Sequence, residues 1–462
     1  MAWSFKVVGG GQEIGANAYL LKIDGLPLLI DAGLHPKKFG QESLPDYETI
    51  QEELEAIFIS HAHLDHVGSL PIIHRRHPQA PIFATLPTKA IALRMLHNTV
   101  TVMNLFREEK GLHEYPFFEH EDLYPLEGAI VGLVFHPLGH LLGKGRWNLG
   151  DWVTIRGQIQ AHFIPSGHIL GAAGILFQQG GRRLYYTGDI SLQDQALIPG
   201  ATLPEGEVDT LIMECTYAND PGYYSQKRQE EVEKLAAAAA RILNQGGCVL
   251  IPAFALGKTQ EMLIILHSLI RQGKIPSVPL YISGLGKIIT EMYQNFRSYL
   301  RSEVSMESFD LFSVLGFLDD LSLSKLLKTP GMIVATNGMM VENTPSARLA
   351  RRMIQEERHG IFFCGYIDPD TLGYRVFHSR PGDWLTFSPD EGPIQRVNPH
   401  IHRFYLSSHA DRHELLEIAR RLRPRRIVLV HGLREGMDFL RGELEGQSEI
   451  LIPEKGETIG LD

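Results

Sequence analysis

The chain has 462 residues, and its 44 lysines and arginines against 54 aspartates and glutamates give a formal net charge of −10. Hydrophobic residues make up 44% of the chain, which excludes global disorder, and three cysteines are too few for a disulfide framework. The acidic balance argues against a protein that coats nucleic acid, and the lack of a long apolar run or a leader pattern favours a cytoplasmic protein without a membrane span.

The first half of the chain is rich in short apolar segments with β-branched residues, which predict strands. These segments are residues 5–8, 18–23, 27–30, 56–59, 158–164, 174–178, 183–187 and 210–213. One long helix is expected at 88–105. Because strands outnumber helices, we expect sheets that are covered by helices on their outer faces.

Beyond residue 220, helices and buried strands alternate, which is typical of βαβ units and predicts a parallel sheet. The helices are expected at 229–243, 258–271, 288–300 and 346–357, and the strands at 248–251, 280–283, 332–335 and 360–365. The earlier pattern then returns, with a strand at 404–406, a helix at 412–422 and a strand at 426–430. We therefore expect one α/β domain, residues 1–216 and 398–462, that is interrupted by an inserted α/β domain at 217–397.

Two glycine motifs resemble nucleotide-binding loops and are set aside. Gly9–Gly15 follows a strand, but a second strand follows it instead of a helix, so we interpret it as a hairpin. The Gly-Lys-Thr sequence at 257–259 resembles the end of a phosphate-binding P-loop, but the position that requires the upstream glycine holds Pro252. His136 and His140 are interpreted as surface or packing histidines.

Three histidines and one aspartate directly follow the strand expected at 56–59: His61, His63, Asp65 and His66. His61 and His63 alternate onto one side of an extended segment, and Asp65 and His66 come one turn later and face a second point. A lone histidine is more often a packing residue, but four ligand-type residues in this spacing indicate a metal site. Imidazole and carboxylate ligands suit Zn²⁺, with Mn²⁺ as the alternative.

The His-x-His-x-Asp-His spacing is specific to the metallo-β-lactamase fold, and the chain resembles that family at three further motifs. Residues 28–33 resemble its first motif, which implies that Asp31 orients the histidine loop without binding metal. His168 and Asp189 stand in its third and fourth motifs, where the aspartate bridges two ions. The resemblance implies an αββα sandwich with two Zn²⁺. One ion would be held by His61, His63, His168 and Asp189, and the other by Asp65, His66 and Asp189.

Glu214, His409 and His431 each follow an expected strand and resemble motifs A, B and C of the β-CASP subfamily of nucleases. Residues 251–257 and 335–340 resemble segments of the inserted domain of that subfamily. The resemblance implies that His431 completes the second metal site. His409 would contact the scissile phosphate or protonate the leaving oxygen, and Glu214 would orient that imidazole and raise its pKa. The implied catalytic residues are Asp65, Glu214 and His409, and the implied phosphate contacts are Ser407, Thr336, Asn337 and Gly338.

A histidine in motif C is similar to the RNA-processing branch of the subfamily, whereas the DNA-repair branch usually has valine. The chain resembles the compact bacterial β-CASP ribonucleases, ribonuclease J and the endonuclease subunit of the cleavage and polyadenylation factor. The implied activity is zinc-dependent hydrolysis of RNA phosphodiester bonds, as an endonuclease or a 5′–3′ exonuclease, with a homodimer left open. The alternatives are a hydrolase of single-stranded DNA or of a small ester or thioester on the same metal site, and a non-catalytic RNA-binding paralogue.

Basic residues gather at 420–426 and at Arg348, Arg351 and Arg352. Such clusters are more often solvated faces than RNA contacts. Residues 281–287 and 365–373 depart from the common β-CASP form, which leaves substrate selection open.

Overall fold

The computed structural model describes residues 2–134, 152–220, 228–316, 319–388 and 392–462, and the chain forms two compact units. The first unit consists of residues 1–194, 199–224 and 409–462, and the second of residues 195–198 and 225–408. The domain boundaries expected from the sequence, with an insert at 217–397, stay a prediction. Within the described ranges, no helix combines the length and the apolar character that crossing a bilayer requires.

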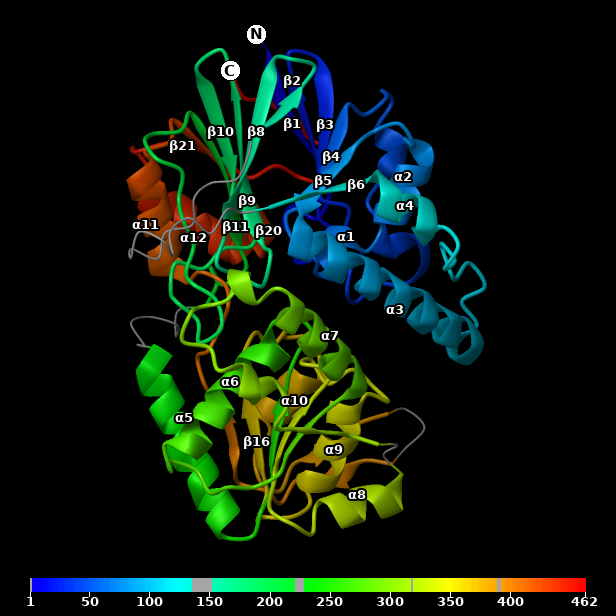
Figure 1. Ribbon diagram of the computed structural model, residues 1–462, viewed down its shortest axis with the longest axis vertical. Helices are drawn as coiled ribbons and strands as arrows, with labels where there is room; N and C mark the ends of the chain where they lie inside the picture. Colours follow the sequence, from blue (N-terminus) through cyan, green and yellow to red (C-terminus); the bar gives the residue numbers. More distant parts are fainter. Residues whose placement is uncertain (1, 135–151, 221–227, 317–318, 389–391) are drawn as a thin grey trace. The chain divides into compact units, whose positions relative to one another are not determined.

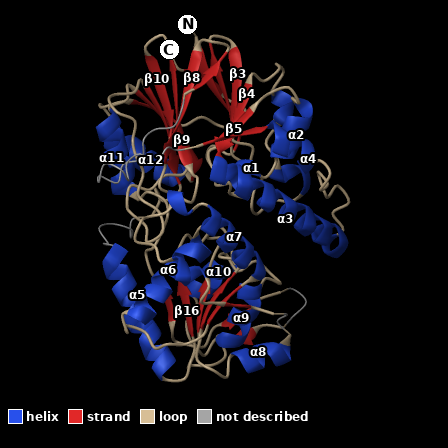
Figure 2. Cartoon of the chain, viewed as in Figure 1, coloured by secondary structure: helices blue, strands red, loops and turns tan. Residues whose placement is uncertain are grey.

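Two seven-stranded sheets form the centre of the first unit (Figures 1 and 2). In spatial order the first sheet contains β22 (Thr458–Gly460), β1 (Trp3–Gly9), β2 (Ala18–Ile23), β3 (Leu26–Ile30), β4 (Ala56–Phe58), β5 (Ile82–Thr85) and β6 (Ile130–Leu133). The second contains β21 (Glu449–Leu451), β20 (Arg426–Gly432), β11 (Thr210–Cys215), β10 (Arg182–Tyr186), β9 (Ala173–Gln179), β8 (Ile159–Pro165) and β7 (Val153–Ile155). Each sheet is parallel in one half and antiparallel in the other.

The inner faces of these two sheets pack on one another through aromatic rings. The ring of Phe58 on β4 lies 6.1 Å from that of Phe163 on β8 and 5.1 Å from that of Phe177 on β9, measured between centroids. The outer faces carry α1 (Leu64–Val67), α2 (Leu70–Arg76), α3 (Leu86–Lys110) and α4 (Leu123–Ala129) on the first sheet, and α11 (Arg412–Leu422) and α12 (Arg434–Leu444) on the second. The αββα sandwich is therefore confirmed.

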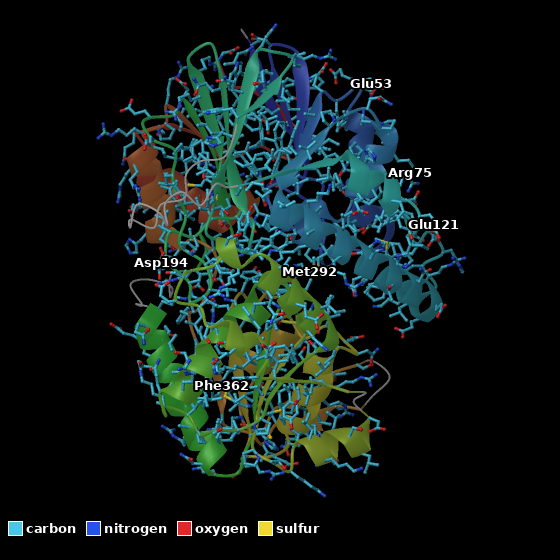
Figure 3. The ribbon with its side chains drawn as sticks, in the orientation of Figure 1. Glu53, Arg75, Glu121, Asp194, Met292 and Phe362 are labelled. Atoms are coloured by element: carbon cyan, nitrogen blue, oxygen red, sulfur yellow. The ribbon has the colours of Figure 1, made fainter. Side chains whose placement is uncertain are left out.

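The second unit is built on a six-stranded sheet in which every pairing is parallel. Its spatial order is β14 (Ser313–Val314), β13 (Leu280–Ile282), β15 (Met332–Ala335), β12 (Val249–Pro252), β16 (Gly360–Phe363) and β19 (Ile401–Arg403). Its helices are α5 (Arg228–Asn244), α6 (Lys258–Arg271), α7 (Gly284–Asn295), α8 (Asp320–Leu326), α9 (Pro345–Met353) and α10 (Leu372–His378). Apolar side chains fill both faces of the sheet, and Phe362, labelled in Figure 3, is fully buried on one of them. The predicted parallel sheet is confirmed.

Local sequence signals mark where two long helices of the first unit begin. The Thr85 hydroxyl accepts the Thr88 amide at 3.2 Å, and Pro87 occupies the first turn of α3, where a missing amide hydrogen costs nothing. Asp411 accepts the Glu414 amide at 2.9 Å, and the Glu414 carboxylate accepts the Asp411 amide in return. These reciprocal bonds start α11 at the residue that the sequence predicted.

Two sequence predictions about local structure have clear outcomes. The Gly9–Gly15 hairpin is confirmed, because β1 pairs antiparallel with β2 and Gly9 lies opposite Ala18. The strand predicted at 404–406 is wrong, since β19 covers Ile401–Arg403 and ends before it. The Phe404 amide still donates to the Phe363 carbonyl of β16 at 2.8 Å, but the Leu406 amide turns back onto the Phe404 carbonyl at 2.9 Å, so the chain leaves the sheet at this point.

Candidate metal centre

The segment between β4 and α1 brings the ligand-type side chains of the first unit together. His63 is the N-cap residue of α1 and has an extended conformation. His61 and His63 therefore project from extended chain, and Asp65 and His66 project from the first helical turn, as the spacing predicted. Short loops after β8 and β10 carry His168 and Asp189.

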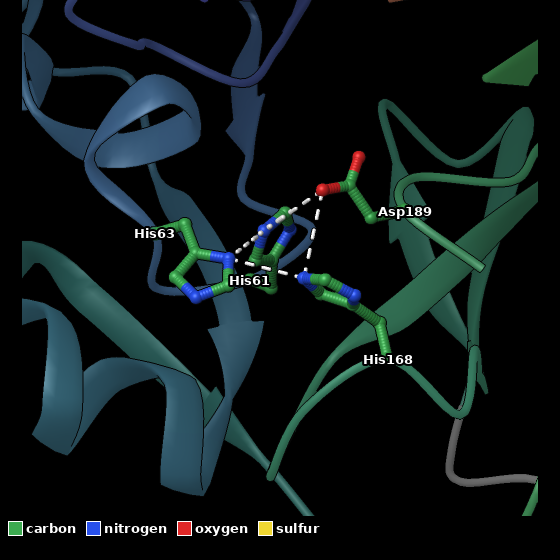
Figure 4. Close-up of side chains that lie close together, drawn as sticks. All are labelled: His61, His63, His168 and Asp189. Atoms are coloured by element: carbon green, nitrogen blue, oxygen red, sulfur yellow. Dashed lines mark hydrogen bonds and ion pairs between the residues drawn. The ribbon is translucent and has the colours of Figure 1, made fainter. Parts of the chain in front are cut away.

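The first group of side chains contains His61, His63, His168 and Asp189, whose ligand atoms point toward one another (Figure 4). Nδ1 of His63 lies 3.1 Å from Nε2 of His61 and 3.0 Å from Nε2 of His168. Oδ2 of Asp189 lies 3.5 Å from each of the same two Nε2 atoms. His61, His168 and Asp189 are buried, and His63 is half-buried.

The second group contains Asp65, His66 and His431. Oδ2 of Asp65 lies 3.3 Å from Nε2 of His431 and 3.7 Å from Nε2 of His66. The other oxygen of Asp189, Oδ1, lies 3.3 Å from Nε2 of His66 and 3.4 Å from Nδ1 of His431. The two oxygens of one carboxylate thus face two different groups.

This donor set fits a metal cation. Nδ1 of His66 lies 2.8 Å from Asp31 Oδ2 and Nδ1 of His61 lies 3.1 Å from the Ser60 hydroxyl, which assigns the ring proton to Nδ1 in both. Their Nε2 atoms then direct lone pairs at the oxygens of Asp189, and a positive charge is needed between such atoms. A tetrahedral ion with bonds of about 2.0–2.1 Å requires ligand atoms ~3.3–3.4 Å apart, and the separations in the two groups are 3.0 to 3.7 Å.

Burial and neighbouring charges shift the pKa values of these side chains in opposite directions. Burial raises the pKa of Asp189, but the imidazoles of His431, His66 and His61 hold that pKa well below its ordinary value. Burial lowers the pKa of His66, but Asp189, Asp31 and Asp65 raise it well above the ordinary value. Burial also lowers the pKa of His61. A proton on Nε2 of His66 and a metal ion would therefore compete for the same position.

Asp31 lies behind the histidine loop and belongs to neither group. Its Oδ1 accepts the Ser60 amide at 2.8 Å, and its Oδ2 accepts the Ser60 hydroxyl at 2.9 Å, the Tyr186 hydroxyl at 2.7 Å and Nδ1 of His66 at 2.8 Å. Asp31 has a φ of 60°, which is uncommon for a residue with a side chain. This geometry supports the orienting role that the family resemblance implied.

His431 is placed by an irregularity at the end of β20. The pairing of β11 with β20 shifts register between Glu214 and Cys215, and His431 has a φ of 52°. A Cβ atom on Gly432 would lie 2.4 Å from the Cys215 carbonyl oxygen, so only glycine permits this close approach. Nδ1 of His431 lies 2.9 Å from the Thr216 hydroxyl, which leaves Nε2 facing Asp65.

Glu214 and His409 form a pair beside the first group. Nδ1 of His409 lies 3.2 Å from both carboxylate oxygens of Glu214 and 3.9 Å from Oδ2 of Asp189. Glu214 is held by the amides of Ile190 at 2.7 Å and Thr216 at 3.3 Å. Burial lowers the pKa of His409, but the carboxylates of Glu214, Asp189 and Asp65 together outweigh that effect and raise the pKa. A protonated imidazole that faces a buried carboxylate can serve as a general acid.

Sequence reasoning missed several polar side chains that support the two groups. Ser60, Tyr186 and Thr216 contact Asp31 or His431, and Asn17 Nδ2 lies 3.1 Å from Nε2 of His66. Ser60 directly precedes His61, and Tyr186 and Thr216 lie within three residues of Asp189 and Glu214, but nothing in their spacing indicates a contact. Asn17 follows the glycine hairpin, whose distance from the histidine loop along the chain hides the relationship.

The expected phosphate contacts all belong to the second unit. Thr336, Asn337 and Gly338 lie after β15, where the Thr336 amide donates to the Ser283 hydroxyl at 3.2 Å. Ser407 is buried, and its carbonyl oxygen accepts a hydrogen bond from Arg228 at 2.8 Å. Their role in phosphate binding stays a prediction.

Many of the basic residues noted in the sequence have acidic partners. Arg421 pairs with Glu417, Arg423 with Glu207, Arg426 with Glu449, and Arg352 with Glu356, at 2.7 to 3.4 Å. The exposed pairs favour the interpretation of these residues as solvated faces, whereas Arg426 is buried. His136 and His140 lie outside the described residues.

Three family models match consecutive parts of the chain. "Metallo-beta-lactamase superfamily" matches residues 11–218, "Beta-Casp domain" matches residues 259–376, and "Zn-dependent metallo-hydrolase RNA specificity domain" matches residues 394–453. A solved structure, a protein of unknown function from Enterococcus faecalis V583, covers 100% of both chains with a TM-score of 0.57 and 17% identity, which shows likeness of fold.

Curated relatives are similar over nearly the whole chain. Cleavage and polyadenylation specificity factor 73 of Drosophila melanogaster is 29% identical over 96% of this chain and 62% of its own length. Endoribonuclease YSH1 of Candida glabrata is 26% identical over 95% and 56%, and Integrator complex subunit 11 of Danio rerio is 26% identical over 98% and 73%. The chain thus spans less than two thirds of the length of the Drosophila melanogaster and Candida glabrata relatives.

Proposed function

The chain belongs to the metallo-β-lactamase superfamily and carries a β-CASP domain, and from this premise we propose that it is a metal-dependent ribonuclease that hydrolyses phosphodiester bonds within RNA. The single observation that carries the proposal is the position of Asp189. One of its oxygens faces His61 and His168, and the other faces His66 and His431. A carboxylate with one oxygen directed at each of two cation-binding groups suits a two-metal hydrolase.

The proposed ligands are divided between the two groups. His61, His63, His168 and Asp189 would hold one ion, and Asp65, His66, His431 and Asp189 the other. Zn²⁺ is proposed because all donors are imidazole nitrogens or carboxylate oxygens at tetrahedral spacing. When bound, such ions lower the pKa of water and neutralise charge that develops on a phosphate.

The remaining chemistry would come from side chains of the first unit. Asp31 holds His66 and the Ser60 amide, and so keeps the ligand loop in one conformation. Glu214 faces His409 with both oxygens, which favours the imidazolium form and fixes the orientation of the ring. His409 would then donate a proton to the leaving oxygen of the cleaved phosphodiester.

RNA is proposed as the substrate on two grounds. The RNA specificity model matches residues 394–453, which include His409 and His431. Relatives that cover nearly the whole chain are named an endoribonuclease and a cleavage factor. The second ground favours internal cleavage over digestion from an end.

The test is a cleavage assay with zinc-loaded full-length protein and end-labelled RNA that carries either a 5′-phosphate or a 5′-hydroxyl. Internal fragments from both RNAs are expected, and cleavage should vanish in a His63→Ala, Asp65→Ala double variant. Release of mononucleotides from the 5′ end alone would indicate an exonuclease. Turnover of matched single-stranded DNA or of a small ester without RNA cleavage, or equal RNA cleavage by the double variant, would contradict the proposal.

A further inference from the structure

Two cations of the second unit bind neighbouring carbonyl groups of the chain. Nζ of Lys258, the first residue of α6, donates to the carbonyl oxygen of Leu406. The guanidinium of Arg228, the first residue of α5, donates to the carbonyl oxygen of Ser407 at 2.8 Å. Lys258 is 8% exposed, so both its charge and its partner are removed from water.

Glu261 keeps this arrangement in place. It lies on α6 one turn after Lys258, and its Oε1 atom is 2.6 Å from Nη2 of Arg228. The same carboxylate accepts the amides of Ala196 at 2.8 Å and Leu197 at 3.0 Å. Because one carboxylate is shared among so many donors, the two cations are only partly neutralised.

The charge of a lysine at this position lowers the stability of the fold. Its charge stands at the N-terminal end of a helix, where the helix dipole disfavours a cation, and it is buried. Burial and the nearby Arg228 lower the pKa of Lys258 to about 8, although Glu261 opposes them. The bond to the buried Leu406 carbonyl therefore has to offset these costs, and it fixes the direction of that carbonyl.

The two bonds fix the direction of the peptide groups that follow. In a trans peptide the carbonyl of one residue and the amide of the next point in opposite directions. Since the carbonyls of Leu406 and Ser407 point at Lys258 and Arg228, the amides of Ser407 and Ser408 point away from them. Upstream, the Tyr405 amide donates to Glu231 at 2.9 Å, which fixes the start of the segment.

We propose that Lys258 and Arg228 are positioning residues, which hold Ser407 and Ser408 so that their amides and the Ser407 hydroxyl receive an oxygen of an RNA phosphate that flanks the cleaved one. The proposal rests on the ribonuclease function proposed above. It assigns a role to the Gly-Lys-Thr sequence at 257–259, whose lysine binds a backbone carbonyl of its own chain in place of a nucleotide phosphate.

The test compares full-length zinc-loaded Lys258→Met with wild type on two substrates. The first is RNA, and the second is bis(p-nitrophenyl) phosphate, a small diester that needs the metal centre alone. We expect KM for RNA to rise about 10- to 100-fold, as for a misplaced binding group, while turnover of the small diester and zinc content stay unchanged. Methionine matches the length of lysine but leaves the Leu406 carbonyl without this donor, so thermal unfolding of the variant is measured first to establish that it is folded.

Two further variants serve as controls. Lys258→Arg keeps a charged donor and should restore most of the affinity for RNA. Lys274→Met removes a lysine of the same unit from an exposed ion pair with Glu233, and it should leave both substrates unaffected. Amide hydrogen exchange at Ser407 and Ser408, measured by mass spectrometry of the covering peptide, should change in Lys258→Met and not in Lys274→Met.

The outcomes separate the two proposals. If wild type cleaves RNA and a folded Lys258→Met has an unchanged KM, the positioning role is wrong and the ribonuclease function stands. If Lys258→Met loses turnover of both substrates in parallel, the lysine supports the fold in general and the positioning role is again wrong. If wild type cleaves no RNA, the ribonuclease function itself fails.

Discussion

The hydroxyl of Thr216 lies 2.9 Å from Nδ1 of His431, and the same hydroxyl lies 3.5 Å from the carbonyl oxygen of His431. An imidazole Nδ1–H can donate to this hydroxyl while the hydroxyl donates to the carbonyl, so one side chain fixes both the tautomer and the position of His431. Nε2 is then the atom that faces Asp65, at 3.3 Å.

Replacement of Thr216 should weaken the second ion selectively. Thr216→Val keeps the shape and removes the hydroxyl, and loss of such a supporting bond lowers metal affinity by about 10- to 100-fold. Zinc titration by calorimetry should show one weakened site and one unchanged site. Thr216→Ser should behave as wild type, and equal weakening of both sites would argue against this role.

Asp189 should be required for both ions, because its two oxygens face different groups. Asp189→Asn is expected to reduce bound zinc, measured by inductively coupled plasma mass spectrometry, at both sites. His63→Ala, by contrast, should affect mainly the first site, since His63 contacts His61 and His168. Retention of two zinc ions by Asp189→Asn would show that the carboxylate does not connect the groups.

His409 should act at the bond-breaking step and not in metal binding. His409→Ala is expected to lower kcat about 10²- to 10⁴-fold, the usual contribution of a general acid, with zinc content unchanged. A substrate with a p-nitrophenolate leaving group needs no protonation, so its turnover should fall much less. An equal loss on both substrates would contradict the acid role.

The Glu214 carboxylate should set the alkaline limit of activity. Burial lowers the pKa of His409, and Glu214, together with Asp189 and Asp65, raises it above the ordinary value, so the acid form persists to higher pH when the Glu214 carboxylate is present. Glu214→Gln removes the largest of these raising effects, and activity should therefore begin to fall at a lower pH than in wild type. The pH profile of kcat for RNA measures this shift, and an unmoved alkaline limb would separate Glu214 from the titration of His409.

Glu414 should make the stability of the first unit depend on pH. Burial and the neighbouring Asp411 raise its pKa from 4.5 to about 7, and one of its oxygens has no hydrogen-bond partner among the described residues. The contribution of Glu414 to the free energy of unfolding, up to about 3 kcal/mol, is fully present below pH 4.5. It is lost as the pH rises through 7. Glu414→Gln preserves the helix cap, so denaturant unfolding should show a flatter pH dependence between these values.

Removal of metal should lower thermal stability. A metal ion that binds only the native state stabilises it by about 2.7 kcal/mol when the concentration of free metal is 100 times Kd. A chelator should therefore lower Tm, and added Zn²⁺ should restore it. The double variant His63→Ala, Asp65→Ala should show a smaller response to either addition.

Patterns among residues that are close together in the sequence were enough to predict several helices and the arrangement of the histidine loop. Helices α6 and α11 have the bounds that the sequence pattern predicted, and the spacing from His61 to His66 placed two pairs of ligand-type side chains on two sides of one loop. These features depend on neighbours within a few residues, and local geometry varies little there. The segment 404–406 was predicted wrongly because the Leu406 amide turns back onto the Phe404 carbonyl, and charged side chains from distant helices bind the Tyr405 amide and the Leu406 carbonyl.

The tertiary structure decided which distant residues meet and how they are oriented. The pairing of Glu214 with His409 spans 195 residues, and that of Thr216 with His431 spans 215. Motif resemblance identified Glu214, His409 and His431, but the position of Thr216 follows from a register shift between β11 and β20. The tertiary structure likewise decides which histidines the two oxygens of Asp189 face, and that Lys258 donates to the Leu406 carbonyl. Such contacts depend on the packing of strands and helices far apart in the chain, and no local preference of the residues encodes them.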